Sequence, residues 1–209
     1  MAISRISSGS TGSFSGSYVT GDLIVIHAVD TGSSAIPLTP SGYTQISSVA
    51  QSANNFAMAA FYKFATSASE TYPTITSAVA SSWVIYRGVA ATPFVSIGGQ
   101  SGTSNSIAYS GIVTYQNPGQ DWVVTFGASS NNLGGVGTHP PTNTTLIVEA
   151  SASNYEAAIF DSGAPLSTYG FNSKTLTAST NWLTKTAELV AGTGTPPPTT
   201  PTDLFFVMF

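Results

Sequence analysis

Aromatic residues alternate along two short runs near the middle of the chain, Phe56 to Phe64 and Trp83 to Tyr86. In the first run every second residue is apolar, so an extended strand would turn one large apolar face toward a core. A helix over the segment AMAAFYKFA is the alternative, because Ala and Met favour helices. The aromatic alternation and the absence of capping residues favour strands in both runs.

The composition supports an all-β fold. Charged residues make up only 7% of the chain, whereas a typical soluble domain has roughly 25%. Helix surfaces are usually rich in Glu, Lys and Arg, while a surface of Ser, Thr, Asn and Gly suits strands and turns. The chain also has 20 Gly and 12 Pro, which are typical of turns.

The same composition disfavours several classes of function. Only five residues are Lys or Arg and the net charge is −4, so we do not expect nucleic-acid binding. There is no Cys, which excludes disulfides and thiolate metal sites. No apolar window is long enough to predict a membrane-spanning helix, and the first residues lack the apolar centre of a Sec signal peptide.

A faint internal repeat, about 100 residues apart, suggests two related halves. The segment DLIVIHAVD begins at Asp22, and DWVVTFGAS begins at Asp121. Both faces of the first segment are apolar, which predicts a central strand. Two four-stranded halves predict an all-β, jelly-roll-like antiparallel β-sandwich over residues 21–190.

The two ends of the chain are predicted to make assembly contacts. Residues 1–20 form a Ser/Gly-rich arm, residues 191–202 a Pro-rich connector, and residues 203–209 a strand that is apolar on both faces. An apolar strand at an end must be buried, in this chain or in another subunit. A closed homo-oligomer such as a trimer would bury it. The candidate contact residues are Phe14, Tyr18, Leu204, Phe205, Phe206, Val207, Met208 and Phe209.

Three scarce charged residues of the central stretch are predicted to have a structural role. Glu70 follows the first aromatic run, Lys63 lies within it, and Arg87 ends the second. We expect Glu70 to form an ion pair with Lys63 or Arg87 that holds the two strands together. The alternative role, an anion-binding site, has less support.

No residue pattern specifies a reaction. The nucleophile-elbow, P-loop, dinucleotide-binding and zinc-protease motifs are absent from the sequence. Glu149, Glu156 and Asp161 lie close in sequence, and paired carboxylates catalyse glycoside hydrolysis, but solvated or paired carboxylates without a catalytic role are the favoured explanation. His27 and His139 could share a metal only if the fold joined them, so a core-edge histidine is the expectation for His27. We therefore predict no catalytic residue, no metal and no cofactor.

The aromatic side chains outside these runs raise the possibility of sugar binding. Trp83, Trp122 and Trp182 lie in apolar strand patterns, so core packing explains them first. Tyr109, Tyr115 and Tyr169 lie in weaker segments and are expected to expose their rings. Tyr109 and Tyr115 are the candidate glycan contacts.

The segments GDLIVIHAVD, TPSGYTQIS, FAMAAFYKFATSASETYPTI and WVIYRGV resemble a β-sandwich domain of tailed-bacteriophage structural proteins. In that domain a GDLL strand is followed by a P-x-GW turn, a YYK-A strand with SE after it, and a YRGV strand. Tyr43 stands here where the pattern has Trp. The matching positions are Gly21-Asp22, Pro40-Ser41-Gly42, Tyr62-Lys63, Ser69-Glu70 and Tyr86-Arg87-Gly88-Val89.

The resemblance implies a jelly-roll-like virion domain without known catalysis. We therefore expect a structural protein that decorates or cements the capsid or joins an appendage to it. Its partners would be other virion proteins: major capsid, portal, tail or baseplate subunits, or further copies of this chain. The alternative function is a carbohydrate- or receptor-binding module of a tail, baseplate or fibre. A glycan hydrolase that uses Glu149 and Glu156 is the third and weakest hypothesis.

Overall fold

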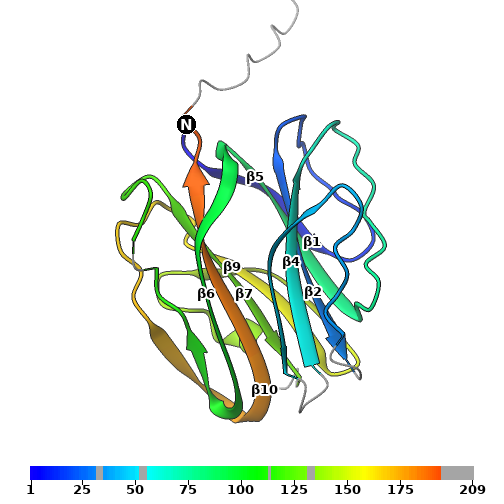
Figure 1. Ribbon diagram of the computed structural model, residues 1–209, viewed down its shortest axis with the longest axis vertical. Helices are drawn as coiled ribbons and strands as arrows, with labels where there is room; N and C mark the ends of the chain where they lie inside the picture. Colours follow the sequence, from blue (N-terminus) through cyan, green and yellow to red (C-terminus); the bar gives the residue numbers. More distant parts are fainter. Residues whose placement is uncertain (32–34, 52–55, 113, 131–134, 194–209) are drawn as a thin grey trace, which may run out of the picture.

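The computed structural model describes residues 1–31, 35–51, 56–112, 114–130 and 135–193. Two five-stranded antiparallel sheets pack face to face, and one short 3-10 helix, Val136–Thr138, is the only helical turn among these residues (Figure 1). No helix in the described ranges is long and apolar enough to cross a membrane. The strands are β1 Ser4–Ser10, β2 Leu23–Thr31, β3 Thr44–Gln51, β4 Phe56–Phe64, β5 Ala80–Arg87, β6 Val89–Tyr109, β7 Trp122–Ser129, β8 Thr145–Ala152, β9 Tyr155–Asp161 and β10 Asn172–Ala191.

Each half of the chain forms one complete sheet, and the two sheets have the same strand order. The first sheet has the order β1-β5-β2-β4-β3 and the second has the order β6-β10-β7-β9-β8. Asp22 and Asp121, where the sequence repeat begins, each precede the central strand of their own sheet. The predicted all-β antiparallel sandwich is thus confirmed. The sheets have five strands each instead of four, because β1 and β6 each add an edge strand.

The chain passes from one sheet to the other at Gly88. This residue adopts a φ of 81°, a conformation that favours glycine. A Cβ atom at this position would lie 2.2 Å from the carbonyl oxygen of Ala2, so a side chain has no room here. The Met1 amine donates to the Gly192 carbonyl oxygen, which places the N-terminus beside the end of β10 (Figure 1). The start of the chain, the crossover and the end of β10 therefore meet at one end of the sandwich.

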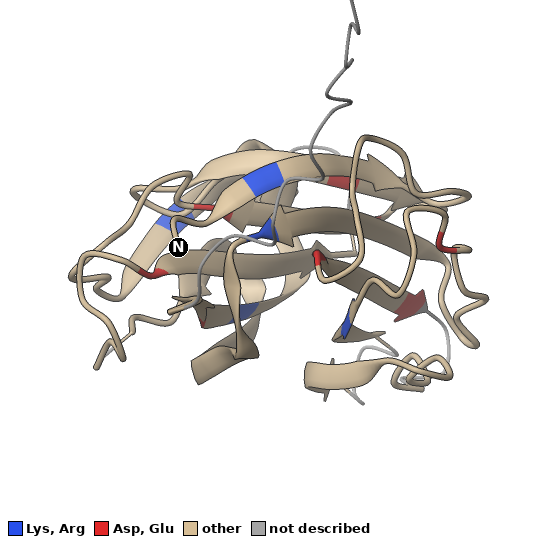
Figure 2. Cartoon of the chain, turned by 90° about the horizontal axis from the view of Figure 1, so that it is seen from above, with Lys and Arg blue, Asp and Glu red and all other residues tan. Residues whose placement is uncertain are grey.

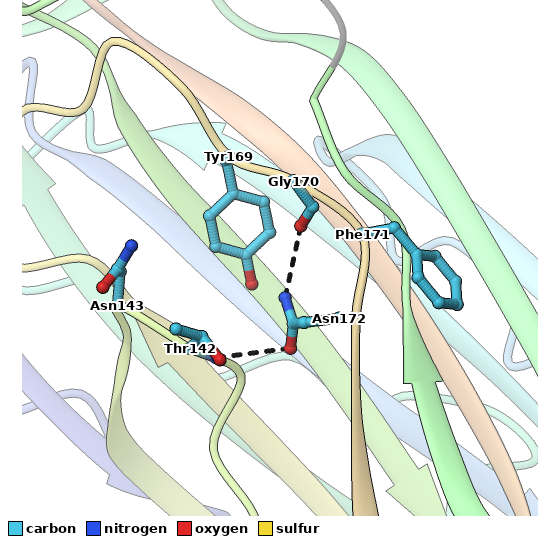
Figure 3. Close-up of a pocket in the computed structure, with 6 residues that line it drawn as sticks. All are labelled: Thr142, Asn143, Tyr169, Gly170, Phe171 and Asn172. Atoms are coloured by element: carbon cyan, nitrogen blue, oxygen red, sulfur yellow. Dashed lines mark hydrogen bonds between the residues drawn. The ribbon is translucent and has the colours of Figure 1, made fainter.

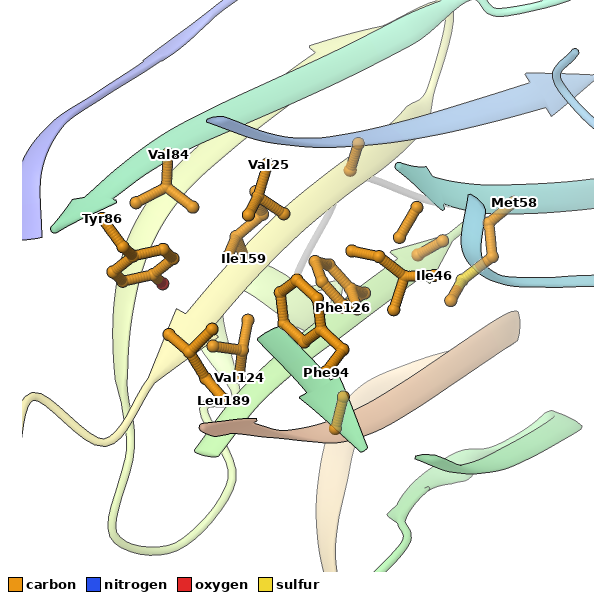
Figure 4. Packing of buried hydrophobic residues seen from close by; sticks show 14 of the residues in the cluster. Val25, Ile46, Met58, Val84, Tyr86, Phe94, Val124, Phe126, Ile159 and Leu189 are labelled. Atoms are coloured by element: carbon orange, nitrogen blue, oxygen red, sulfur yellow. The ribbon is translucent and has the colours of Figure 1, made fainter. Parts of the chain in front are cut away.

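The core lies between the two sheets (Figure 4). Val25 and Val84 of the first sheet meet Phe126 and Ile159 of the second, and all four are fully buried. The other face of β2 is also covered: Ile24, Ile26 and Ala28 belong to a separate apolar cluster outside the first sheet. Both faces of β2 are therefore buried, as its sequence predicts. Burial of each large apolar side chain contributes about 1.5–3 kcal/mol to folding.

The N-terminal segment is part of the first sheet and not a free arm. β1 pairs with β5, with Ser4 opposite Arg87 and Ser10 opposite Ser82. Phe14 and Tyr18, which were predicted to contact another subunit, pack against other residues of this chain. The Phe14 ring lies 5.3 Å from the Trp83 ring, and Tyr18 is only 4% exposed. The outer face of the first sheet needs these aromatic residues to cover its apolar side chains. Residues 204–209 lie outside the described residues.

One buried carboxylate ties the two sheets together. Asp161, on β9 of the second sheet, has no exposed surface. It accepts hydrogen bonds from Arg5 Nε (3.1 Å) and Nη2 (3.0 Å), from Tyr86 Oη (2.9 Å) and from the Gly163 amide (2.9 Å). Arg5 and Tyr86 belong to the first sheet, so this contact crosses the sandwich. A buried charge with this many donors is stabilised in place, whereas an unpaired one is costly.

Replacing Asp161 with Asn should destabilise the protein by about 3 kcal/mol or more, because Arg5 and Tyr86 lose a charged acceptor. The measurement is urea unfolding followed by tryptophan fluorescence. Lys174→Gln is the control, since Lys174 forms no ion pair among the described residues, and its effect should stay below about 0.5 kcal/mol. An unchanged unfolding midpoint for Asp161→Asn would show that the contact does not hold the sheets together.

Candidate functional site

Glu70 and Lys63 form an ion pair, and Arg87 binds a different carboxylate. Lys63 Nζ lies 2.6 Å from Glu70 Oε2, while the other Glu70 oxygen accepts from the amide (2.6 Å) and hydroxyl (2.9 Å) of Thr66. The hydrogen bond from Lys63 is the main reason that the pKa of Glu70 falls to about 2. This pair fastens the turn after β4 and does not join β4 to β5, which are separated by β2, so the prediction that it holds the two strands together is wrong.

Arg87 forms a two-point contact with Asp22. Its Nε lies 2.8 Å from Asp22 Oδ1 and its Nη2 lies 2.6 Å from Oδ2. Leu23 pairs with Tyr86 across β2 and β5, so Asp22 stands next to Arg87. The pairing register of β2 with β5 therefore makes Asp22, and not Glu70, the partner of Arg87. The charged residues lie singly at separate places on the chain and do not gather on one face of the molecule (Figure 2).

The two tyrosines predicted to contact glycans are buried, so that prediction is wrong. Tyr109 is fully buried and its hydroxyl donates to the His139 carbonyl oxygen at 2.8 Å. Tyr115 is 7% exposed and packs in a small cluster with Val123 and Tyr169. Loops over the outer face of the second sheet cover all three tyrosines. The interpretation of the three Trp residues as core residues is confirmed, with exposures of 1%, 6% and 5% for Trp83, Trp122 and Trp182.

The structure brings Glu149 and Glu156 together around Gly137. A Cβ atom at Gly137 would lie 2.1 Å from Glu149 Oε2 and 2.2 Å from Glu156 Oε1, so both oxygens converge on this glycine. Glu156 is 2% exposed; Ser129 Oγ donates to its Oε2 at 2.7 Å and the Gly137 amide donates to its Oε1. Burial, together with the charge of Glu149, raises the pKa of Glu156 to about 7.

This carboxyl pair does not resemble an open hydrolytic site. Both oxygens of Glu156 already accept hydrogen bonds from the protein, and the 3-10 turn at 136–138 covers them. Asp161, the third acid of the predicted cluster, is engaged by Arg5 and Tyr86. The geometry suits a buried carboxyl group that fastens the turn.

A second acid pair, Asp121 and Glu188, was not foreseen from the sequence. Glu188 is fully buried, and its Oε1 accepts from the Gln116 amide at 2.5 Å. Asp121 accepts from the amides of Ala191 (2.7 Å) and Asn117 (2.8 Å). Burial and, after it, the neighbouring Asp121 raise the pKa of Glu188 to about 7.

His27 lies in the core between the sheets. It has no exposed surface, and its ring centre is 5.6 Å from that of Phe126. Burial lowers the pKa of His27 to about 3, and neither ring nitrogen makes a hydrogen bond of ordinary geometry to a described residue. His139 Nδ1 lies 2.9 Å from the Gly135 carbonyl oxygen. Among the described residues no group of three or more His, Asp or Glu is placed to hold a metal ion.

A surface cavity of about 280 Å³ lies where the loop before β8 meets the start of β10 (Figure 3). Phe171 at its rim is 64% exposed, and Tyr169 in its wall is 3% exposed. Asn172 is held by two hydrogen bonds of 3.3 Å, to the Gly170 carbonyl oxygen and from the Thr142 amide. The sequence interpretation missed this site. A Gly-Phe-Asn segment in a weakly patterned region was its one signal.

Comparisons with protein-family models, with curated proteins and with solved structures found no match.

The buried His27 should make the free energy of unfolding fall as the pH is lowered. Its folded-state pKa is about 3, against 6.5 for an ordinary histidine, so between these values the unfolded chain binds a proton that the folded chain does not. Stability should therefore fall as pH drops below about 6.5, by up to about 1.4 kcal/mol per pH unit. Urea unfolding at about pH 7, 6 and 5 should show a steeper loss for the wild type than for His27→Leu. Parallel pH profiles would contradict the prediction.

Glu156 should act in the opposite direction. Its folded-state pKa of about 7 lies above the ordinary value of 4.5, so its contribution is fully present below pH 4.5 and is lost as pH rises through 7. The free energy of unfolding of the wild type should therefore fall by about 1–2 kcal/mol between roughly pH 5 and 8, and this fall should be absent in Glu156→Gln. Glu149→Gln is the matched control, because it removes the neighbouring charge and should reduce the loss without abolishing it. If Glu156→Gln loses as much stability over this pH range as the wild type, Glu156 is not the group responsible.

Proposed function

We propose that this protein is a structural subunit of a bacteriophage virion, which decorates or cements the shell or joins an appendage to it. The proposed mechanism is burial of surface against neighbouring subunits, without catalysis. Support comes from the resemblance of residues 21–89 to virion β-sandwich domains and from the uncharged strands at one side of the sandwich.

The observation that carries the proposal is a pair of edge strands without charge. β3 and β6 are the edges of their sheets and contain no Lys, Arg, Asp or Glu. They lie on the same side of the sandwich, because Gln51 Nε2 at the end of β3 donates to the Gly102 carbonyl oxygen on β6 at 3.0 Å. On the other side, β1 carries Arg5 and β8 carries Glu149.

Uncharged edge strands favour association between copies. An exposed edge offers unpaired amide and carbonyl groups to another strand, and monomeric proteins usually block it with Lys, Pro or bulges. β6 has Pro93 and irregular pairing near its start, but residues 98–104 pair in regular register with β10. This stretch of β6 therefore forms a sheet edge of regular geometry, and we propose that another strand docks along it beside the contact of Gln51 with Gly102.

Exposed apolar side chains add to the surface available for burial. Leu38 is 60% exposed and Val79 is 37% exposed. Their loops are neighbours, since the Leu38 amide donates to the Thr76 carbonyl oxygen at 3.1 Å. A surface with few charges and several apolar side chains suits a subunit that is packed into an assembly. The proposed partners are major capsid, portal, tail or baseplate subunits, or further copies of this chain. The strand expected at 203–209 is not among the described residues, so its contribution stays a prediction.

The proposal predicts self-association through the side that carries β3 and β6. Sedimentation of the wild type at increasing concentration should show a closed oligomer, such as a trimer. Ser101→Lys places a charge in the regular stretch of β6 and should shift the protein toward the monomer. Thr145→Lys, on the opposite edge strand β8, is the matched control and should leave the oligomer intact.

A wild type that remains monomeric, or equal effects of the two Lys variants, would contradict assembly through this side. Membership of the virion is tested separately by mass spectrometry of purified particles. The protein should be present in fixed copy number and resist removal by salt, because apolar and backbone contacts are screened little. Its absence from the particle would refute the proposed function.

A further inference from the structure

Phe171 is an exposed aromatic residue on an anchored segment of the backbone. It has the highest exposure, 64%, among the large hydrophobic residues that the structure describes. The residues on both sides of it are anchored. The Ile112 amide donates to the Tyr169 carbonyl oxygen at 2.7 Å, and Asn172 pairs with Tyr109 at the start of β10. The backbone of this segment therefore loses little conformational freedom when a ligand packs on the ring.

The cavity beside Phe171 has polar groups arranged around it (Figure 3). The Asn172 amide is fixed by its contacts with Gly170 and Thr142, so its orientation is set before any ligand arrives. Asn143, on the far side of the cavity, adopts a φ of 63° in the turn before β8. Its side-chain amide makes no hydrogen bond to a described residue. The cavity thus has one fixed and one free amide.

The hydroxyl of Tyr169 gives a second, independent indication of a ligand. Tyr169 lines the cavity and is 97% buried by its 3% exposure, yet its hydroxyl has no hydrogen bond of ordinary geometry among the described residues. Burial raises the pKa of this hydroxyl, partly opposed by the nearby Asn172 and Thr125 side chains. The hydroxyl lies near both side chains without a hydrogen bond of ordinary geometry to either, so a ligand group that bonds to it would complete its hydrogen bonding.

The chemistry of these groups selects the class of ligand. None of the six residues around the cavity is charged, which favours a neutral molecule. Amides and a tyrosyl hydroxyl pair well with alcohols, and an exposed aromatic ring offers a flat apolar face. A sugar presents both surfaces, hydroxyl groups at its edge and C–H groups on its face. The volume of about 280 Å³ is near the lower end for ligand pockets and suits one or two sugar rings.

We propose that this cavity, the Phe171 pocket, binds a neutral saccharide. The sugar ring packs on Phe171, and its hydroxyls bond to Asn143, Asn172 and Tyr169. The proposal goes beyond the structural function and does not depend on it. A virion subunit with such a pocket could also attach to a neutral glycan.

The test is a microarray of neutral glycans probed with the labelled full-length protein, followed by calorimetric titration of the best-retained glycan. The wild type should retain at least one neutral glycan. Phe171→Ala and Asn143→Ala should weaken its binding by about tenfold or more, which corresponds to the loss of one good contact. Tyr169→Phe, which keeps the ring, should weaken it as well.

Leu38→Ala is the matched control, because Leu38 is similarly exposed, at 60%, in the first half of the chain. Its affinity should stay within about twofold of the wild type. Thermal unfolding confirms that each variant is folded. Failure of the wild type to retain any neutral glycan would overturn the proposal, as would unchanged binding by Phe171→Ala. A change of oligomeric state in Phe171→Ala without glycan binding would identify the pocket as a contact between copies, and would also overturn it.

Discussion

The apolar layer between the two sheets is the interaction on which the rest of the structure depends. Each half of the chain forms one complete sheet, so neither half can bury its own inner face. Val25 and Val84 lose water only when Phe126 and Ile159 cover them (Figure 4). The contact of Arg5 and Tyr86 with Asp161 adds a directional tie across the same layer. Folding of the two halves must therefore be mutually dependent.

The two halves share a topology but have diverged in charge. In the first half Arg87 neutralises the carboxylate of Asp22, at the start of the central strand. In the second half the equivalent Asp121 lies beside Glu188, and backbone amides stabilise it instead. The glutamate pair around Gly137 and the Phe171 pocket also belong to the second half. Both halves thus contain buried groups that respond to pH, His27 in the first and Glu156 and Glu188 in the second, and the second half also carries the proposed ligand pocket.

Local patterns predicted much of the fold, and long-range pairing decided the rest. The alternating run at 56–64 and the apolar segment at 22–30 identify their strands, since periodicity is a local property. The Lys63–Glu70 pair was foreseeable because the two residues are seven apart in the chain. Arg87 finds Asp22 only through the register of β2 with β5, which no local pattern contains.

Burial of weakly patterned segments was also beyond local prediction. Tyr109 and Tyr115 are buried because loops from distant parts of the chain cover the outer face of the second sheet. Phe14 and Tyr18 cover the outer face of the first sheet in the same way. Phe171 is exposed for a related reason, because its anchored neighbours hold it outside the loops that cover the second sheet.

Native-state hydrogen exchange tests most directly whether the two halves form one cooperative unit. Amides of the central strands β2 and β7, which lie in different sheets, should exchange with the same free energy of opening, equal to that of global unfolding. Asp161→Asn should lower both values together. A second sheet that stays protected while β2 exchanges at a much lower free energy would contradict the account, because it would show that one half is stable without the other.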